Sequence, residues 1–351
     1  MKKVLTIVFY VISVCVALFS ILSIFRNSEI RYMKMLDFPR IQFFIISIIC
    51  IIGLFIFIKK WKLYNYILII GLLSGLFINS TFLINYTSLV AVEVSTAKDV
   101  KTSDQAFSIL LSNVKMTNRK VTPLIKLIEL KNPDFILAME VDTWWDTELK
   151  VLENDYPYSQ HTINDVTYGM VLYSKFPLEK VEVNYLTNQN VPSFESTINL
   201  GEGKTIGFHT VHPVPPTHFK NLPDNAGQQE NALKKLGKVI EGRKFPTIVA
   251  GDLNDAVWSY IDELTGTKNV LYDVRVGRGF FNSFNAENFL MRWPLDHILV
   301  TEEFRLKKLE RLPKIGSDHF PIYVELVIIS NLPEATGGAQ EISNNKMIGQ
   351  D

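Results

Sequence analysis

The sequence predicts an α+β domain of packed sheets with helical cover, preceded by three transmembrane helices. Three long apolar runs occupy residues 4–25, 41–58 and 63–92 of the 351-residue chain. Beyond about residue 100, short apolar runs rich in β-branched and aromatic residues alternate with polar segments, as β-strands do. These runs outnumber the helical patterns, so packed sheets are favoured over a simple alternating βα fold.

The three long runs are each close to or above the ~20 residues that a helix needs to cross a bilayer. Lys2 and Lys3 precede the first run, as in a signal peptide. That run is longer than the ~7–15 apolar residues of a signal peptide, and no small-residue cleavage site precedes Arg26. We therefore expect retained helices, which together form a membrane anchor over residues 1–92. Their expected bounds are about 4–25, 41–58 and 63–85.

Basic residues predict the orientation of this anchor. Lys2, Lys3 and the KKWK turn at 59–62 would share one side of the membrane. The other side would carry Arg26, Arg31, Lys34 and Arg40. The dense cluster in a short turn favours a cytoplasmic N-terminus by the positive-inside rule. With three spans, the C-terminal domain would then be extracytoplasmic, in a multi-pass protein of the cell membrane.

Charge and cysteine content restrict the chemistry of the remaining chain. Residues 1–92 hold nine of the 36 basic residues and two of the 36 acidic ones, so the remainder is acidic. An acidic body disfavours tight binding of long polyanions. Cys15 and Cys50 both lie in apolar runs, which excludes thiol chemistry, disulfides and a Cys-based zinc site from the rest of the chain.

Strand-like runs and two helical patterns are expected between residues 105 and 328. The runs are AFSILLSN, PDFILAMEVD, GMVLYSKFP, TIGFHTVH, FPTIVAGDLND, LDHILV and FPIYVELVI. Thr122 and Pro123 are expected to begin one helix, as N-cap and first-turn proline. The other covers 232–240, and Gly242 can end it. Residues 93–104 are expected to form a linker, and the polar residues 329–351 a disordered tail.

Several strand-like runs end or begin at polar residues that can bind metal or phosphate. If neighbouring strands share an edge, these side chains converge on one rim. They are Asn113, Glu140, His212, Asp252, Asn254, Asp296, Asp318 and His319. Gly251 allows a tight turn, and alternate positions after it can face the same side.

Each motif also has an ordinary structural explanation. Glu140 alone fits a surface carboxylate at a strand end, and GDLN fits a hydrated Asx turn. The prolines after His212 favour a held side chain, whereas His209 is interpreted as structural. Alternation along LDHILV places His297 on the opposite face from Asp296, so His297 is also interpreted as structural.

Taken together, the polar set suits phosphoester hydrolysis. Glu140 and Asp318 offer the hard oxygen ligands that Mg²⁺ or Mn²⁺ prefers. Such a cation would polarise a phosphoryl oxygen. Asp252, steered by Asn254, could orient and deprotonate a water molecule.

The second Asp-His element completes this chemistry. His319, held by Asp296, could donate a proton to the phosphate or to the leaving oxygen. The carboxylate is expected to raise the pKa of the imidazole and keep it charged.

The order of these motifs resembles the endonuclease/exonuclease/phosphatase superfamily. The resemblance covers roughly residues 105–328, through SNV, PDFILAME, GMVLYSKFPL, VHPVPP, GDLN, LDHIL and GSDHFP. It implies a DNase I-like four-layer α/β sandwich of two mixed β-sheets flanked by helices. The N-terminal spans also resemble those of membrane-anchored bacterial members, whose catalytic domain lies outside the cytoplasm.

The resemblance also assigns roles to residues. Glu140 resembles the principal metal ligand, with Asp318 near the metal, and Asn113 the asparagine that organises metal and phosphate. Asp252 and Asn254 resemble the pair that positions the attacking water.

The remaining roles concern phosphate contact. His212 resembles the phosphate-contacting histidine, and Asp296 with His319 the acid–histidine pair. The family often has an arginine where this chain has GQQENALKKL, and a Thr-Trp pair where it has NSFNAENFLMRW. These positions shape substrate contact, so the departures affect substrate choice rather than metal chemistry. Basic loops that would grip DNA are not evident.

These observations predict a membrane-anchored, divalent-metal-dependent phosphoesterase that cleaves a phosphodiester or phosphomonoester by metal-assisted attack of water. Its substrate is left open between nucleic acid, phospholipid and a small phosphoester, and no protein partner is evident beside the lipid bilayer. The alternative is a catalytically inactive membrane binding or scaffolding module, against which the complete residue set argues. A transport or sensing unit is disfavoured because the spans lack internal charges.

Overall fold

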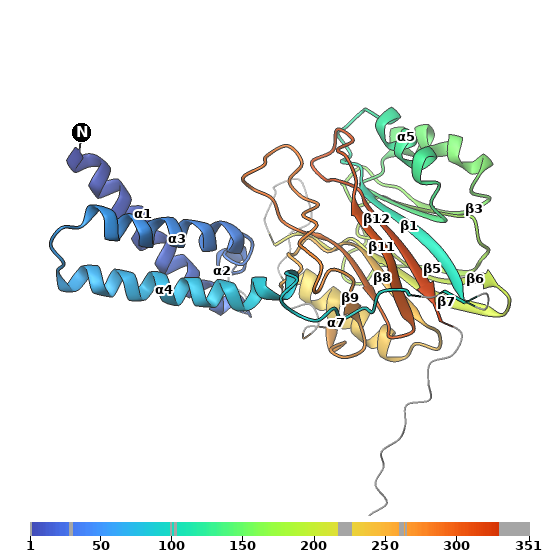
Figure 1. Ribbon diagram of the computed structural model, residues 1–351. Helices are drawn as coiled ribbons and strands as arrows, with labels where there is room; N and C mark the ends of the chain where they lie inside the picture. The colour runs from blue at the N-terminus through green and yellow to red at the C-terminus, as the bar shows by residue number, and fades with distance from the viewer. Residues whose placement is uncertain are drawn as a thin grey trace, which may run out of the picture.

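The computed structural model describes residues 2–27, 31–98, 100–101, 104–216, 227–259, 263 and 265–329. Within them, a bundle of long helices projects from one side of a two-sheet sandwich (Figure 1). The expected disordered tail begins at residue 329, and residues 330–351 lie outside the described residues.

The bundle contains three helices that are long and apolar enough to cross a membrane. They are α1 (Lys2–Leu22), α3 (Arg40–Phe57) and α4 (Leu63–Leu83). The candidate spans, with their flanking turns, are Val4–Arg26, Arg40–Phe57 and Leu63–Tyr86, close to the expected bounds. The short elements at their ends are η1 (Ser23–Asn27), α2 (Arg31–Met35) and η2 (Ile84–Tyr86).

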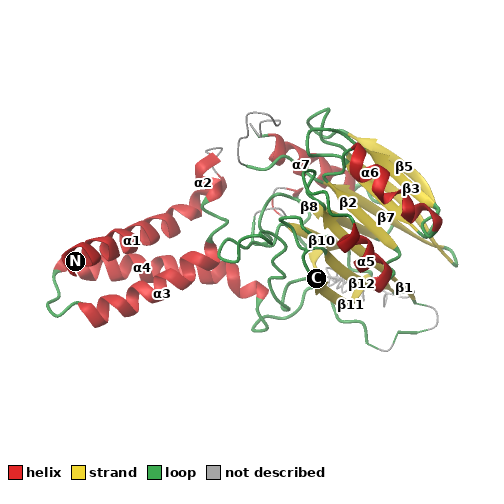
Figure 2. Cartoon of the chain, turned by 90° about the horizontal axis from the view of Figure 1, so that it is seen from above, coloured by secondary structure: helices red, strands yellow, loops and turns green. Residues whose placement is uncertain are grey.

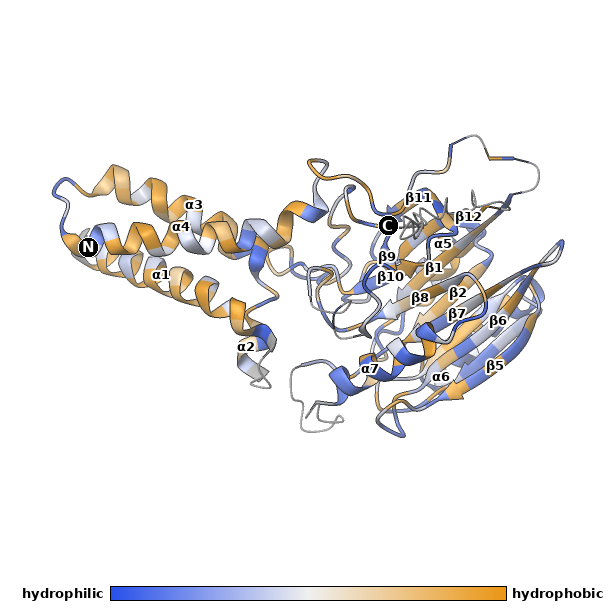
Figure 3. Ribbon diagram, turned by 90° about the horizontal axis from the view of Figure 1, so that it is seen from below, coloured by the Kyte–Doolittle hydropathy of each residue, from blue (hydrophilic) through white to orange (hydrophobic). Residues whose placement is uncertain are grey.

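Hydrophobic residues cover most of the three long helices (Figure 3). The N-terminus and the turn between α3 and α4 lie at the end of the bundle away from the sandwich (Figures 1 and 2). The turn between α1 and α3 and the end of α4 lie at the other end. Three antiparallel spans therefore separate the N-terminus from the sandwich, which is the arrangement that the run lengths predict.

Two six-stranded sheets form the sandwich. The first contains β1 (Gln105–Asn113), β2 (Phe135–Met139), β3 (Tyr158–Thr162), β4 (Met170–Ser174), β11 (Phe304–Arg311) and β12 (Ile322–Ile328). The second contains β5 (Leu178–Asn184), β6 (Ser193–Gly201), β7 (Lys204–Val211), β8 (Thr247–Asp252), β9 (Tyr272–Asp273) and β10 (Asp296–Val300). The strand orders are β11-β12-β1-β2-β4-β3 and β5-β6-β7-β8-β10-β9.

Both sheets are mixed and both are covered by helices. β1 pairs with β2 in parallel, as β7 does with β8, and the other neighbouring pairs among the described strands are antiparallel. Helices α5 (Thr122–Lys131) and α6 (Thr143–Leu149) pack on the first sheet, and α7 (Gln228–Glu241) packs on the second. The largest apolar cluster lies between the sheets. This is the DNase I-like four-layer α+β fold that the resemblance implied.

The expected strand runs correspond to β1, β2, β4, β7, β8, β10 and β12. The strands that the sequence reading missed include β5 and β11, whose sequences LEKVEVN and FRLKKLER alternate charged with apolar residues and keep one face in solvent. Thr122 is not the N-cap of α5, because Val121 holds that position and no described side chain caps it. Pro123 does lie in the first turn, where its missing N–H costs nothing.

A buried cluster of charges joins the bundle to the sandwich. Arg26 donates from Nη1 to Asp37 Oδ2 at 2.7 Å, and Arg40 donates to the other oxygen of the same carboxylate. Arg40 and Asp37 are buried, so each charge depends on its partner for compensation. Trp258 of the sandwich contacts two residues of this cluster. Its Nε1 donates to the backbone oxygen of Asp37, and its own backbone oxygen accepts from Arg26 Nη1, each at 2.9 Å.

Apolar packing continues this junction. One cluster contains Leu83 at the end of α4 and Tyr86 of η2, together with Val257, Trp258 and Leu295 from the sandwich. The chain then passes along the edge of the first sheet, where Ala97 N donates to Leu306 O at 2.8 Å. The bundle and sandwich therefore share a core. The division into an anchor (1–92), a linker (93–104), a catalytic domain (105–328) and a tail stays a prediction.

Asp37→Asn removes the charge that compensates two arginines at the junction. We expect the free energy of unfolding to fall by about 3–5 kcal/mol, because the fully buried Arg40 would keep an uncompensated charge. Denaturant unfolding of the detergent-solubilised protein measures this change. Glu182→Gln, which breaks the solvent-exposed pair with Lys180, is the control and should leave the midpoint unchanged.

Asp255, beside this junction, predicts a pH-dependent stability. Burial raises its pKa from 3.8 to about 7, and the charge of Asp37 adds to the shift while Arg26 opposes it. Because the folded state holds this proton more tightly than the unfolded chain, stability is lost as pH rises from about 4 to about 7. Asp255→Asn should therefore stabilise the protein more at pH 8 than at pH 5, by on the order of a few kcal/mol. Unfolding curves at the two values measure this difference, and an equal effect at both would contradict the assignment.

Candidate active site

The polar strand ends of both sheets meet at one edge of the sandwich. Asn113 ends β1 and Glu140 follows β2, while Asp252 ends β8. Asp296 begins β10 directly opposite Asp252 in the antiparallel pair. The alignment that was expected from strand ends is therefore present, and it brings residues from the two sheets into contact.

Asn113 links the two halves of this edge. Its Nδ2 donates to Glu140 Oε1 at 2.9 Å and to Asp252 Oδ2 at 3.1 Å. Its Oδ1 accepts from the backbone N–H of Lys115 at 3.0 Å, which fixes the orientation of the amide. Asn113 is buried, so the position of its amide is set by these three contacts.

His319 lies between two buried carboxylates. Its Nδ1 is 2.8 Å from Asp296 Oδ2, and its Nε2 is 3.4 Å from Asp252 Oδ2. Burial by itself would lower the pKa of His319, but the charges of Asp296 and Asp252 outweigh burial and raise that pKa from 6.5 to about 10. The ring is therefore an imidazolium at neutral pH, with both nitrogens protonated.

The two carboxylates differ in their protonation. Burial raises the pKa of Asp252 from 3.8 to about 7, although His319 and the hydrogen bond from Asn254 N oppose the shift. Burial would also raise the pKa of Asp296, but the adjacent His319 holds it below 3.8. Environments that separate the pKa values of neighbouring acids in this way are typical of acid–base sites.

Two groups of ligands could hold a cation at this edge. Asp252, Asp296 and His319 offer ligand atoms within 4.8 Å of one another. A protonated imidazole has no lone pair to give, so this trio suits a hydrogen-bonded acid–histidine–acid chain better.

The carboxylate of Glu140 fits a cation better. Burial raises its pKa and the charge of Asp318 adds a smaller rise, so a cation beside Glu140 would stabilise its charged form. Glu140 accepts one hydrogen bond on each oxygen, from Asn113 Nδ2 and Met116 N, which leaves further lone pairs. This oxygen donor set suits a hard divalent ion.

His212 and Asn254 complete the predicted set. His212 Nε2 lies 3.9 Å from Asp252 Oδ2, and burial lowers the pKa of this histidine to about 3, so it is neutral. Its Nδ1 is buried and has no hydrogen-bond partner among the described residues. Asn254 has the left-handed φ of 52°, and its Nδ2 donates to Pro213 O at 2.9 Å.

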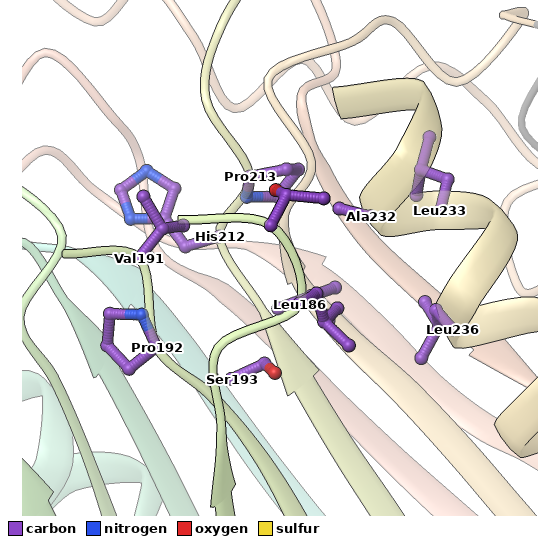
Figure 4. Close-up of a pocket in the computed structure, with 11 residues that line it drawn as sticks. Leu186, Val191, Pro192, Ser193, His212, Pro213, Ala232, Leu233 and Leu236 are labelled. Atoms are coloured by element: carbon purple, nitrogen blue, oxygen red, sulfur yellow. The ribbon is translucent and has the colours of Figure 1, made fainter. Parts of the chain in front are cut away.

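An apolar pocket lies behind His212 (Figure 4). It is lined by Leu186 and Val191 on one side and by Ala232, Leu233 and Leu236 of α7 on the other. The imidazole ring points away from α7. His212 therefore lines the pocket, while its Nε2 lies 3.9 Å from Asp252 Oδ2.

The two histidines interpreted as structural lie apart from this chain of contacts. His297 Nε2 is 2.9 Å from Asp255 O, and burial lowers its pKa to about 3. His209 is buried opposite Glu195 in the pairing of β6 and β7, and burial lowers its pKa to about 4.

Three neighbours of the site were missed by sequence reasoning. Lys115 Nζ lies 3.3 Å from Asp318 Oδ2 and supplies the positive charge nearest to that carboxylate. Ser317 Oγ donates to Asn113 O at 2.8 Å and accepts from His319 N. Tyr168 is buried with its ring 5.2 Å from that of His212. Lys115 and Tyr168 adjoin SNV and GMVLYSKFP, and Ser317 lies within GSDHFP. These positions were the available signal, but single polar residues in or beside a motif are common.

This geometry defines a class of site. A neutral histidine, an imidazolium between two acids, and a carboxylate suited to a divalent cation can bind a phosphate group and transfer protons beside it. The class is that of hydrolases acting on phosphate esters.

Comparison with known proteins agrees with this class. The sequence profile of the Endonuclease/Exonuclease/phosphatase family matches residues 110–319, more than half of the chain. The chain therefore belongs to this family, whose members hydrolyse phosphate esters. No match was found among curated proteins.

Solved structures share the fold. TDP2 of D. rerio, complexed with a single-strand DNA product, aligns with a TM-score of 0.53 and 17% identity over 63% of this chain and 99% of that chain. An endonuclease/exonuclease/phosphatase family protein from Bacteroides thetaiotaomicron aligns with a TM-score of 0.50 and 18% identity over 65% and 99%. One from Beutenbergia cavernae aligns with a TM-score of 0.50 and 14% identity over 64% and 72%.

Gly251 sets the position of Asp252. A Cβ at this glycine would lie 1.8 Å from the carbonyl oxygen of Val211, so a larger residue must move β7 or β8. We expect Gly251→Ala to lower the free energy of unfolding by more than about 3 kcal/mol, as measured by denaturant unfolding. Gly203, whose added Cβ would meet open space at a φ of +74°, is the matched control. Gly203→Ala should cost only about 1 kcal/mol, for its left-handed backbone.

Proposed function

We propose that this chain is a membrane-anchored, divalent-metal-dependent phosphoesterase. The observation that carries the proposal is the continuous chain of contacts at the sheet edge. Asn113 joins Glu140 to Asp252, and His319 joins Asp252 to Asp296. Every link lies in or next to buried residues, where charges and hydrogen bonds act most strongly.

Glu140, with Asp318 beside it, would hold Mg²⁺ or Mn²⁺. When bound, the cation supplies a Lewis acid that polarises a phosphoryl oxygen and neutralises charge. Asn113 donates to Glu140 Oε1 and so keeps this carboxylate turned towards the site. Lys115 neutralises part of the charge of Asp318 and adds a positive group to the rim.

The remaining side chains would bind the phosphate and move protons. A carboxylate with a pKa near 7, as in Asp252, can accept a proton from water at neutral pH. The N–H of Asn254 donates to Asp252 Oδ1 at 2.9 Å and directs the other oxygen towards the site. His319, kept protonated by Asp296, can donate to a phosphate oxygen or to the leaving group. His212, neutral and buried, would offer an N–H hydrogen bond rather than a charge.

The bundle would act as the anchor in the cell membrane, with the catalytic domain outside the cytoplasm. Arg26 and Arg40, on the sandwich side, are both paired with Asp37 in a buried cluster. This leaves the KKWK turn as the denser group of free positive charge, which supports a cytoplasmic location for the turn and the N-terminus. The inactive-scaffold alternative predicts no metal-dependent hydrolysis.

The full-length protein in detergent should hydrolyse bis-p-nitrophenyl phosphate or p-nitrophenyl phosphate with Mg²⁺ or Mn²⁺, and EDTA should abolish the activity. We expect His319→Gln to lower the rate by about 10²–10⁴-fold, because it removes a charged proton donor. His161→Gln is the matched control, since His161 also pairs with an aspartate, Asp146, but on the outer face of the first sheet. Equal losses in both variants would sink the assignment of His319.

Metal binding is measured separately from turnover. Calorimetric titration with Mn²⁺ should show one binding event or more that is weakened at least about tenfold in Glu140→Gln. Glu148→Gln, at an exposed position of α6, should bind like the wild type. An unchanged affinity in Glu140→Gln would place the metal elsewhere.

A further inference from the structure

The loop between β9 and β10 joins the catalytic edge to the membrane bundle. Figure 1 shows this segment, in orange, between the bundle and the sheets. At its base, Phe284 pairs with Trp293 through backbone hydrogen bonds, and the two rings stack at 5.8 Å. The other side of Phe284 faces His319, with ring centres 5.1 Å apart. The base of the loop is therefore part of the wall around the proposed proton donor.

The tip of this loop, residues 288–291, is apolar and exposed. Phe289 is 75% exposed, Leu290 67% and Met291 43%. Two hydrogen bonds to Asn288 close the tip into a turn. Leu290 N donates to the side-chain Oδ1 at 3.0 Å, and Met291 N donates to the backbone O at 3.3 Å. A rigid turn that presents three adjacent large apolar side chains to water is costly unless another surface covers them.

The depth of the tip relative to the bundle indicates which surface covers it. Gln42 lies two residues inside the candidate span Arg40–Phe57, and its Nε2 donates to Leu290 O at 2.7 Å. Two residues of helix rise only about 3 Å, so the tip lies level with the first turn of the span. If this candidate span crosses a bilayer, that depth corresponds to the bilayer interface, where aromatic and apolar side chains are favoured.

Positive charge lies beside the tip. The guanidinium groups of Arg292 and Arg311 both lie over the Phe320 ring, at 5.0 and 4.5 Å from its centre. Phe320 follows His319 directly in the chain. Apolar side chains at the tip of a loop with arginines behind them match the two layers of a membrane surface, acyl chains first and phosphate head groups next.

We propose that the tip 288–291 inserts into the bilayer interface, so that the catalytic edge faces lipid head groups and acts on a phosphoester of a membrane lipid. Glu287 contacts Lys115 Nζ at 3.2 Å, and Lys115 contacts Asp318 at 3.3 Å. Phe289 follows Glu287 by two positions, a reach of at most about 7 Å. An inserted tip therefore holds the site at head-group depth, where a lipid phosphate can reach it. A long nucleic acid would be obstructed there by the bilayer. The lipid-substrate part rests on the proposed phosphoesterase function, whereas the insertion does not.

The first experiment measures insertion without any catalysis. Leu290→Cys is prepared in the full chain with Cys15→Ala and Cys50→Ala, labelled with the fluorophore NBD and reconstituted into vesicles of equimolar phosphatidylcholine and phosphatidylglycerol. We expect blue-shifted emission, and quenching by nitroxides on the lipid acyl chains. Leu130→Cys on α5, 75% exposed, is the matched control and should report water. A label at 290 that is exposed to water would overturn the insertion. A label that is shielded from water but not quenched by the lipid nitroxides would also overturn it, in favour of a protein partner.

The second experiment separates substrate access from chemistry. Phe289→Ser with Leu290→Ser should lower the release of phosphate-containing products from those vesicles by about tenfold or more. The variant loses the favourable free energy of moving two apolar side chains from water into lipid, so the tip no longer holds the site at the vesicle surface. Hydrolysis of the soluble bis-p-nitrophenyl phosphate should stay within about twofold of the wild type. Leu130→Ser with Val151→Ser, both exposed on the far side of the first sheet, is the control and should change neither rate.

The outcomes distinguish the two proposals. A wild type that cleaves the soluble ester or single-stranded DNA but no vesicle lipid keeps the proposed phosphoesterase and overturns the lipid substrate. Equal losses on both substrates in the tip variant would make the tip a structural element and overturn its role in access. A wild type that cleaves nothing overturns the phosphoesterase, and the label at 290 still decides whether the tip inserts.

Discussion

The structure depends on one arrangement of charge, in which two buried carboxylates face each other and share an imidazolium. Asp252 and Asp296 are directly opposite in the pairing of β8 with β10, a position in which like charges repel. His319 reaches them from the turn before β12, which belongs to the other sheet. Because each buried charge needs its counterpart, the contact that builds the site also fixes how the two sheets pack. The geometry of the candidate active site and the packing of the two sheets are therefore coupled.

The same edge is connected to the membrane bundle by packed aromatic rings. Phe38, in the turn before α3, packs edge-on against Trp293, which stacks on Phe284, which in turn packs against His319. The buried cluster of Asp37 with its two arginines holds the start of this chain, and Trp258 ties it to the sandwich. These contacts therefore hold the helical bundle at a fixed angle to the candidate active site. A flexible tether would leave that angle free.

Positive charge and exposed apolar side chains are not spread evenly over the sandwich. The sandwich side of the chain is acidic overall, yet Arg292, Arg311 and Lys115 lie along the edge near His319 and Asp318. Positive groups are thus concentrated where phosphate is expected to bind, and the body around them repels long polyanions. The apolar tip 288–291 lies on the same edge, so positive charge and exposed apolar side chains occur together there.

Much of this architecture is determined by the sequence alone. Runs of about twenty apolar residues indicate the spans, and the spacing of SNV, PDFILAME, GDLN, LDHIL and GSDHFP indicates the family and its fold. Strand periodicity also placed Asp296 and His297 on opposite faces, as the structure does. Periodicity failed for β5 and β11, because exposed strands with alternating charges have no continuous apolar signal.

Only the tertiary structure decided which residues meet. The contact of His319 with both acids joins two sheets, and the contact of Gln42 with Leu290 joins residues 248 positions apart. Local patterns carry no information on such pairs, since they arise from sheet packing and from the docking of the bundle. The same holds for protonation. Whether Asp252 or Asp296 carries the proton depends on burial and on neighbouring charges, and both exist only once the chain has folded.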